Sequence, residues 1–112
     1  MSDLTQKKCV PCEGGIPSLE RAKIEELIKE VPGWEIVELD GYVQIVRIFS
    51  FKNFKAALRF VNQVGDLAET ESHHPDIFLY SWNKVRLSLY THAISGLHEN
   101  DFIMAAKING LV

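Results

Sequence analysis

The fold is decided by the stretch WEIVELDGYVQIVRIF, residues 34–49. Two runs rich in β-branched and aromatic residues, 34–39 and 42–49, flank the dipeptide Asp40-Gly41. Asp-Gly is a strong hairpin signal because both central residues of a type I′ turn need a positive φ. The stretch therefore predicts two antiparallel strands joined by a tight turn.

Apolar residues at helical spacing lie on both sides of this hairpin. They predict a first helix over about residues 19–31, with Ser18 as a plausible N-cap, and a second over Phe54–Glu69, which Asn53 could cap. Pro32-Gly33 would end the first helix. The hairpin is thus expected to connect two helices.

A second hairpin and a third helix complete the pattern. Residues 77–80 and 85–91 read as strands, since apolar and polar side chains alternate along the second of them. Asn100 can cap a final helix that Asn109-Gly110 would end. The order helix, hairpin, helix, hairpin, helix predicts an α+β fold of two layers, with helices on one face of a four-stranded antiparallel sheet. Such sheets leave edges and an open face, so a homo-oligomer is expected.

Length and composition limit the function classes. The chain of 112 residues is expected to form a single domain over residues 18–112, preceded by a flexible tail, residues 1–17. A net charge of −3 provides no basic surface for direct nucleic-acid binding. No apolar stretch approaches membrane-spanning length, and the start resembles no signal peptide, so a cytoplasmic protein is expected.

The two cysteines, Cys9 and Cys12, form a single Cys-x-x-Cys pattern in a segment rich in proline and glycine. A zinc site would need two further ligands, and a redox motif would need a strand before it and a helix after it. An inert, reduced tail is the favoured interpretation, and a metal or thiol role stays open.

Histidines form the main candidate site. His73 and His74 follow the second helix, and His92 ends the last strand, so the hairpin between them should bring all three together. Histidine exchanges protons near neutral pH, because its ordinary pKa is about 6.5, which suits cofactor-free acid–base chemistry. The alternative is a set of surface histidines. A shared metal is disfavoured because adjacent side chains project in different directions. His98 is expected to be solvated or to cap a helix.

Asp101 admits two interpretations. An acidic residue is favoured in the first turn of a helix by the helix dipole, and a carboxylate there could also orient His92. Both roles can hold at once.

The spacing of these residues resembles the signature of the pterin-4a-carbinolamine dehydratases. The resemblance rests on Glu69-x-x-x-His73-His74-Pro75, Trp82, His92 and Asp101, and extends from the first helix to residue 106. It implies a hydro-lyase that dehydrates 4a-hydroxytetrahydrobiopterin to quinonoid dihydropterin. That reaction would recycle the tetrahydropterin of aromatic amino acid hydroxylases, as in phenylalanine hydroxylation. The pterin is the substrate, and no metal or other cofactor is implied.

The resemblance also implies roles for individual residues. His73 and His92 would be the acid–base pair, in either order, and His74 would bind and orient the pterin. The residues that flank them in the expected substrate pocket are Ser72, Tyr90, Thr91 and Ala93. Three residues would support the site: Glu69, Asp101 and Trp82. Trp82 could instead be an aromatic residue of the hairpin that packs on the sheet. Ser72 and Ala93 depart from the acidic residues common in animal members.

Partners follow from the same resemblance. A homodimer or homotetramer is implied, with the second helix packed between subunits, and a functional link to an aromatic amino acid hydroxylase. The alternative function is a non-catalytic dimerisation, assembly or transcriptional cofactor of the same fold. Three imidazoles in a matching pattern favour the enzyme, and a metal-binding module is the third possibility.

Overall fold

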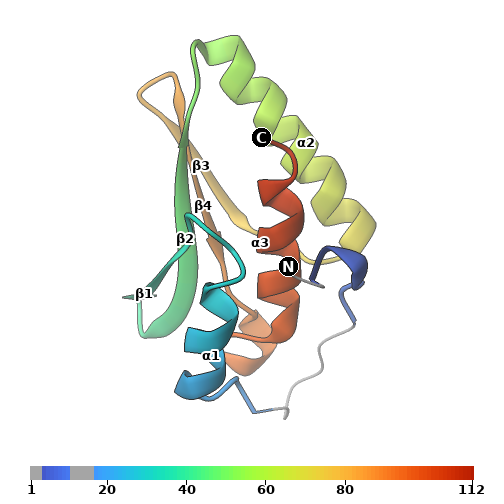
Figure 1. Cartoon of the computed structure of the whole chain (residues 1–112). Helices are drawn as coiled ribbons and strands as arrows, with labels where there is room; N and C mark the ends of the chain where they lie inside the picture. The colour runs from blue at the N-terminus through green and yellow to red at the C-terminus, as the bar shows by residue number, and fades with distance from the viewer. Residues whose placement is uncertain (1–3, 11–16) are drawn as a thin grey trace.

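The computed structural model describes residues 4–10 and 17–112 (Figure 1). Its helices and strands are, in chain order, the 3-10 helix η1 (Leu4–Gln6), α1 (Arg21–Ile28), β1 (Glu35–Leu39), β2 (Tyr42–Ser50), α2 (Phe54–Glu71), β3 (Asp76–Tyr80), β4 (Lys84–Leu89), the 3-10 helix η2 (His92–Ile94) and α3 (Glu99–Asn109). The predicted order of helices and hairpins is confirmed.

The four strands form one antiparallel sheet in the order β1-β2-β4-β3. Asp40 and Gly41 have φ angles of 53° and 82°, as the tight turn between β1 and β2 requires. The long strand β2 pairs with β1 along its first half and with β4 along its second, where Ile45 lies opposite Leu89. The hairpins therefore meet side by side through β2 and β4.

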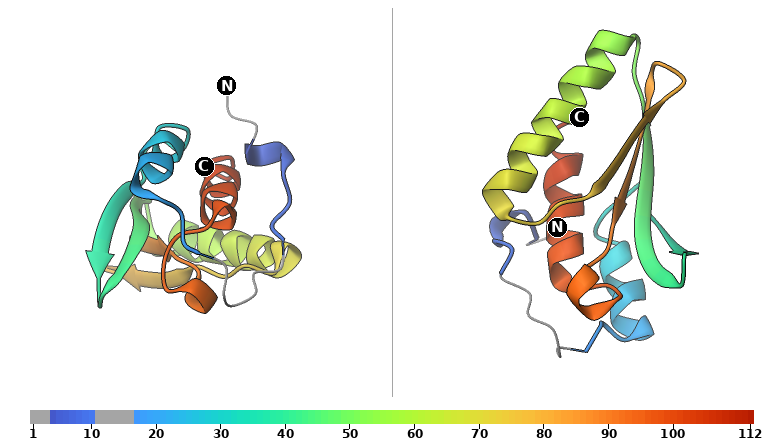
Figure 2. Two further views of the ribbon diagram at one scale, coloured as in Figure 1. Left: turned by 90° about the horizontal axis from the view of Figure 1, so that it is seen from below. Right: turned by 180° about the vertical axis from the view of Figure 1, so that it is seen from behind.

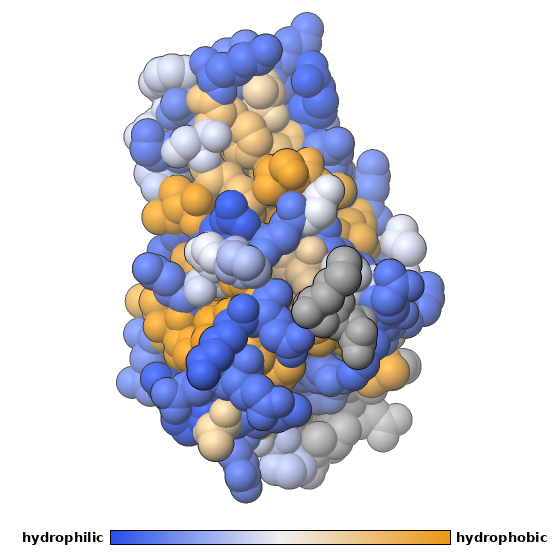
Figure 3. Space-filling model, viewed as in Figure 1, coloured by the Kyte–Doolittle hydropathy of each residue, from blue (hydrophilic) through white to orange (hydrophobic). Residues whose placement is uncertain are grey.

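The three α-helices lie on one side of this sheet (Figure 2), which confirms the predicted α+β fold. Inward-facing side chains such as Ile45 and Leu87 are completely buried, whereas Ile48 on the opposite face is 53% exposed. Viewed from the side of Figure 1, apolar patches lie among the hydrophilic residues of the surface (Figure 3). None of the helices within the described residues is long and apolar enough to cross a membrane.

Helix α3 lies at the centre of the helical layer. All residues from 100 to 106 are buried, on every side of the helix, as expected of a helix that is covered all round. It contacts both α2 and the N-terminal helix η1. The start of α3 is therefore fixed from several directions, and this is the end at which the histidines gather.

The N-terminal segment differs from the predicted flexible tail over the part that the structure describes. Leu4 is only 3% exposed, and residues 4–10 run along α3 and the end of α2. An apolar side chain at Leu4 and side-chain partners for the backbone of Cys9 and Val10 explain the docking. Cys12 lies outside the described residues.

Helix caps are confirmed in one case and corrected in two. Asn53 caps α2, since its Oδ1 accepts from the backbone N–H of Ala56 at 2.8 Å. Helix α1 instead begins after Glu20, two residues beyond Ser18, with no side-chain cap. Helix α3 is capped by His98, which is one of the two roles expected for that residue: its Nδ1 accepts from the N–H of Asn100 at 3.0 Å. Asn100 cannot cap it because its side chain turns towards the N-terminal segment.

Candidate active site

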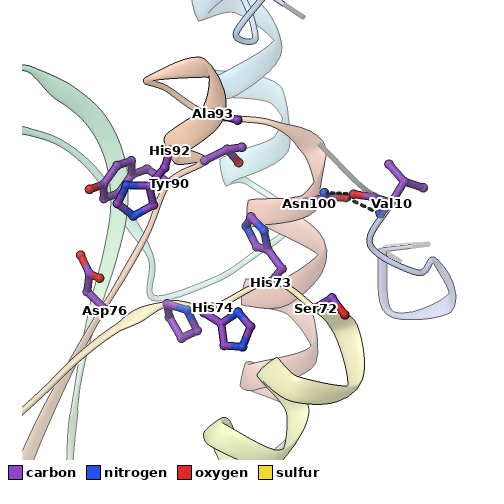
Figure 4. A pocket seen from close by; sticks show the side chains of 11 residues that line it. Val10, Ser72, His73, His74, Asp76, Tyr90, His92, Ala93 and Asn100 are labelled. Carbon is purple, nitrogen blue, oxygen red and sulfur yellow. Dashed lines mark hydrogen bonds between the residues drawn. The ribbon is translucent and has the colours of Figure 1, made fainter. Parts of the chain in front are cut away.

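The predicted histidines come together around a pocket at one end of the sheet (Figure 4). The pocket has a volume of about 340 Å³ and is open to solvent. Its lining comes from the α2–β3 connection and the start of β3, the segment after β4, the first turn of α3 and the N-terminal segment: Val10, Ser72, His73, His74, Pro75, Asp76, Tyr90, Thr91, His92, Ala93 and Asn100. All seven residues predicted as catalytic or substrate-binding are in this set.

The end of α2 places His73. Ser72 adopts the left-handed conformation, with φ of 54°, and the backbone N–H of His73 donates to the carbonyl of Ala68 at 3.2 Å. This is a common way to end a helix and reverse the chain, and here it follows a serine rather than a glycine. The reversal points the imidazole of His73 towards α3.

A buried carboxylate holds the imidazole of His73. The Nε2 atom lies 2.6 Å from Oδ1 of Asp101, a side chain with no exposed surface. The other carboxylate oxygen, Oδ2, accepts from the hydroxyl of Thr91 at 2.9 Å and from the N–H of His98 at 3.0 Å. Because a carboxylate only accepts, Nε2 carries the proton, which leaves Nδ1 as the basic nitrogen of a neutral His73.

The partner of Asp101 was predicted to be His92, and the structure shows His73 in that place. The chain turns after β4, and Thr91 pairs with Gly96 in an isolated bridge. That turn directs the hydroxyl of Thr91 towards Asp101, while His92 opens the helix η2 and is exposed. The ring of His92 packs on Tyr90, with 4.3 Å between the ring centroids.

His74 pairs with Glu69, one of the residues predicted to support the site. Its Nε2 lies 2.5 Å from Oε2 of the carboxylate, one helical turn back on α2. Both side chains are more than half exposed, so this pair contributes little to stability. It does set the direction of the His74 ring at the pocket.

Trp82 does not lie at the pocket, contrary to the prediction of a supporting role. It occupies the turn between β3 and β4, beyond Tyr80, with φ of 55° and an exposed fraction of 60%. The pocket is at the other end of that hairpin, beside Asp76, and the intervening four residues of strand span roughly 13 Å. A place in the signature therefore does not make Trp82 part of the site.

Four further residues line the pocket without a sequence pattern that predicted them there: Val10, Pro75, Asp76 and Asn100. Pro75 and Asp76 directly follow the paired histidines, and that adjacency could have indicated them. Val10 and Asn100 are 90 positions apart, and no local pattern joins them.

A buried ion pair lies beside the pocket, between α2 and α3. The ammonium of Lys107 contacts Oε2 of Glu71 at 2.8 Å, and this hydrogen bond holds the pKa of Glu71 below its ordinary value. Burial, with a smaller contribution from the Glu71 charge, raises the pKa of the Cys9 thiol to about 12. Since the thiolate is the nucleophile, Cys9 is unsuited to thiol chemistry near neutral pH. Within residues 4–10 and 17–112, no group of three histidine, cysteine or acidic residues is arranged to hold a metal ion.

The fold and site define a class of protein: a two-layer α+β domain with a histidine-lined pocket at one end of its antiparallel sheet. The sequence then identifies the family within this class. The chain belongs to the pterin 4 alpha carbinolamine dehydratase family, whose pattern matches residues 17–111.

Two bacterial relatives, each named "Putative pterin-4-alpha-carbinolamine dehydratase", match nearly the full chain. The protein of Chlorobium luteolum is 49% identical over 111 residues, which cover 99% of this chain and 96% of the relative. The protein of Rubrobacter xylanophilus is 47% identical over 111 residues, which cover 99% of this chain and 100% of the relative.

Solved structures share the fold. A transcriptional coactivator/pterin dehydratase from Brucella melitensis superposes with a TM-score of 0.75 at 35% identity, over 84% of this chain and 97% of that one. A pterin dehydratase-like protein described as a RuBisCO assembly factor of the alpha-carboxysome gives a TM-score of 0.59 at 19% identity, over 70% and 88% of the two chains. The second likeness concerns the fold alone.

Proposed function

We propose that this chain catalyses the dehydration of 4a-hydroxytetrahydrobiopterin to quinonoid dihydropterin, with histidines as general acid and base. Family membership and the names of the relatives support the pterin dehydratase activity. The observation that carries the mechanism is the short contact between His73 and the buried carboxylate of Asp101, at the edge of a pocket that also presents His74 and His92.

The reaction is an elimination without net oxidation. The C4a–O bond breaks, and the hydroxyl leaves as water after it receives a proton. The proton on N5 is removed, and its electron pair forms the C4a=N5 double bond. One imidazolium and one neutral imidazole can supply these two transfers near neutral pH.

The geometry favours His73 as the base. Its Nε2–H faces Asp101, so Nδ1 is the nitrogen able to accept the proton from N5, and the carboxylate stabilises the imidazolium that results. His92, exposed on η2 across the pocket, would then protonate the departing hydroxyl. In this arrangement His74, oriented by Glu69, binds the pterin ring, and the rim residues Ser72, Thr91 and Ala93 surround it.

The pterin is the substrate in this scheme, and the residues around the pocket provide every proton transfer that the reaction needs. We also propose that the protein works as a homo-oligomer. Phe54 and Leu58 are 48% and 42% exposed one turn apart on α2, which gives that helix an apolar outer surface.

Alanine substitution tests the proposal. In stopped-flow assays with enzymatically generated 4a-carbinolamine, His73→Ala and His92→Ala should each lower kcat by about 10²-fold or more, as expected for loss of a general acid or base. Trp82→Phe is the matched control, because Trp82 belongs to the family signature but lies outside the pocket, and it should keep wild-type kcat. Wild-type turnover in either histidine variant would contradict the assignment.

A further inference from the structure

The N-terminal segment Lys7–Val10, which we call the strap, is fixed beside the pocket by Asn100. The backbone N–H of Val10 donates to Oδ1 of Asn100 at 3.0 Å, and Nδ2 of Asn100 donates to the carbonyl of Val10 at 2.7 Å (Figure 4). The amide of one side chain thus satisfies both backbone groups of one residue. Asn100 itself is only 2% exposed, so the contact is built into the start of α3.

A second attachment holds the strap to α2. The backbone N–H of Cys9 donates to Oε1 of Glu71 at 2.9 Å, while Lys107 fixes the other oxygen of that carboxylate. The Cys9 thiol also lies 3.6 Å from the carbonyl of Asn100. The strap therefore bridges the end of α2 and the start of α3, which are the same two ends that place His73 and Asp101.

The strap also borders the pocket. Val10 is among the lining residues, together with Ser72 and the three histidines, yet its apolar side chain is 54% exposed. A second hollow, of about 430 Å³, lies along the strap and shares Val10 and Ser72 with the pocket. An exposed valine at the rim of a largely polar pocket is suited to contact with the flat, partly apolar ring system of a bound substrate.

We propose that Val10 on the strap is a substrate-binding residue of the pocket, and that Asn100 is the positioning residue that holds it there. This inference rests on the proposed function, since it takes the substrate to be a pterin. Val10 lies beside Asn100, apart from the three histidines (Figure 4), and its side chain has no group that can transfer a proton. Its apolar contact should therefore bind ground state and transition state alike. Loss of this contact should therefore raise KM and leave kcat close to the wild-type value, because uniform binding affects KM alone.

Two variants separate the contact of the Val10 side chain with the substrate from the positioning of the strap by Asn100. Val10→Gly removes the side chain and keeps both backbone bonds to Asn100, while Asn100→Ala releases the strap. Each should raise KM for the carbinolamine, and weaken equilibrium binding of 7,8-dihydrobiopterin, by roughly tenfold, the factor that corresponds to burial of one valine side chain. Asn62→Ala is the matched control, because Asn62 is an exposed asparagine on α2 outside the pocket, and both constants should stay at wild-type values.

The outcomes separate the inference from the proposed function. Wild-type KM and dihydrobiopterin affinity in Val10→Gly would overturn the inference, and so would a fall in kcat without a rise in KM in both variants. A wild-type protein that neither binds dihydrobiopterin nor accelerates dehydration would overturn the proposed function, and this inference with it. Val10→Gly keeps the test decisive even if Asn100→Ala fails to fold.

Discussion

The carboxylate of Asp101 contacts the ring of His73, the hydroxyl of Thr91 and the backbone of His98, although the side chain has no exposed surface. It therefore links the α2–β3 connection, the end of β4 and the first turn of α3. We expect Asp101→Asn to keep these contacts while it changes the chemistry. The amide oxygen can accept from Thr91 and His98, but the amide nitrogen donates to Nε2 of His73 and so places the ring proton on Nδ1.

The Asp101→Asn variant should thus fold as the wild type does and lose kcat by about 10²-fold or more, because His73, the proposed base, would have the wrong tautomer. Circular dichroism melting and stopped-flow dehydration measure the two properties. Glu69→Gln is the parallel change at the exposed His74 pair, and a smaller loss is expected there, since solvent weakens that interaction. Equal kcat values for the Asp101→Asn variant and the wild type would show that Asp101 does not act through His73.

The sequence predicted the residues of the site better than their pairing. His73, His74 and His92 could be placed together because the two open ends of a hairpin lie at the same end of the sheet. The partner of Asp101 depends on the turn that Thr91 and Gly96 make, which is a tertiary detail. The contact between Val10 and Asn100 joins opposite ends of the chain, so no local spacing could indicate it.

The ion pair of Glu71 and Lys107 joins α2 to α3. Both side chains are largely buried, at 5% and 18% exposure, so each charge depends on the other. Lys107→Met should lower the free energy of unfolding at pH 7 by about 3 kcal/mol, because it leaves a buried carboxylate without its cation. Urea unfolding followed by circular dichroism measures the change. Lys23→Met is the matched control, since its pair with Glu26 is exposed and should contribute about 0–1 kcal/mol.

The same pair gives stability a pH dependence with a definite sign. The pKa of Glu71 is lower in the folded protein than its ordinary value of 4.5. Its contribution is therefore fully present above that value and is lost as the pH falls through the folded pKa. The stability difference between wild type and Lys107→Met should shrink in acid, and a difference that does not change with pH would contradict the role of Glu71.

Elements with strong local signals were predictable from the sequence. The Asp40-Gly41 turn and the cap at Asn53 are each determined by a few neighbouring residues, and the structure confirms both. The cap of α3 was predicted only as a choice, because Asn100 and His98 are both able to cap a helix. The structure uses His98 since the strap occupies the side chain of Asn100.

The outer surface of α2 is the proposed site of self-association of the protein. Leu58→Glu places a charge between apolar neighbours on that surface and should convert the oligomer into monomers. Light scattering coupled to size-exclusion chromatography measures the mass of the particle, which is 12.7 kDa for one chain. Gln63→Glu, an exposed polar position on the same helix, adds the same charge and should leave the mass unchanged. A wild-type particle of one chain would contradict the proposed assembly.

The two tryptophans occupy opposite environments, and this separates their fluorescence. Trp34 is 4% exposed, donates from Nε1 to Asn109 at 2.8 Å and meets the edge of Phe49, whereas Trp82 is 60% exposed on its hairpin turn. The indole of Trp82 is largely in water, so its emission should lie at long wavelength and should be quenched by iodide. Trp34 emits from the core, at the contact between the first hairpin and the end of α3. In the Trp82→Phe protein, Trp34 is the one remaining tryptophan. Its emission should therefore report on the contact between the first hairpin and the end of α3 alone.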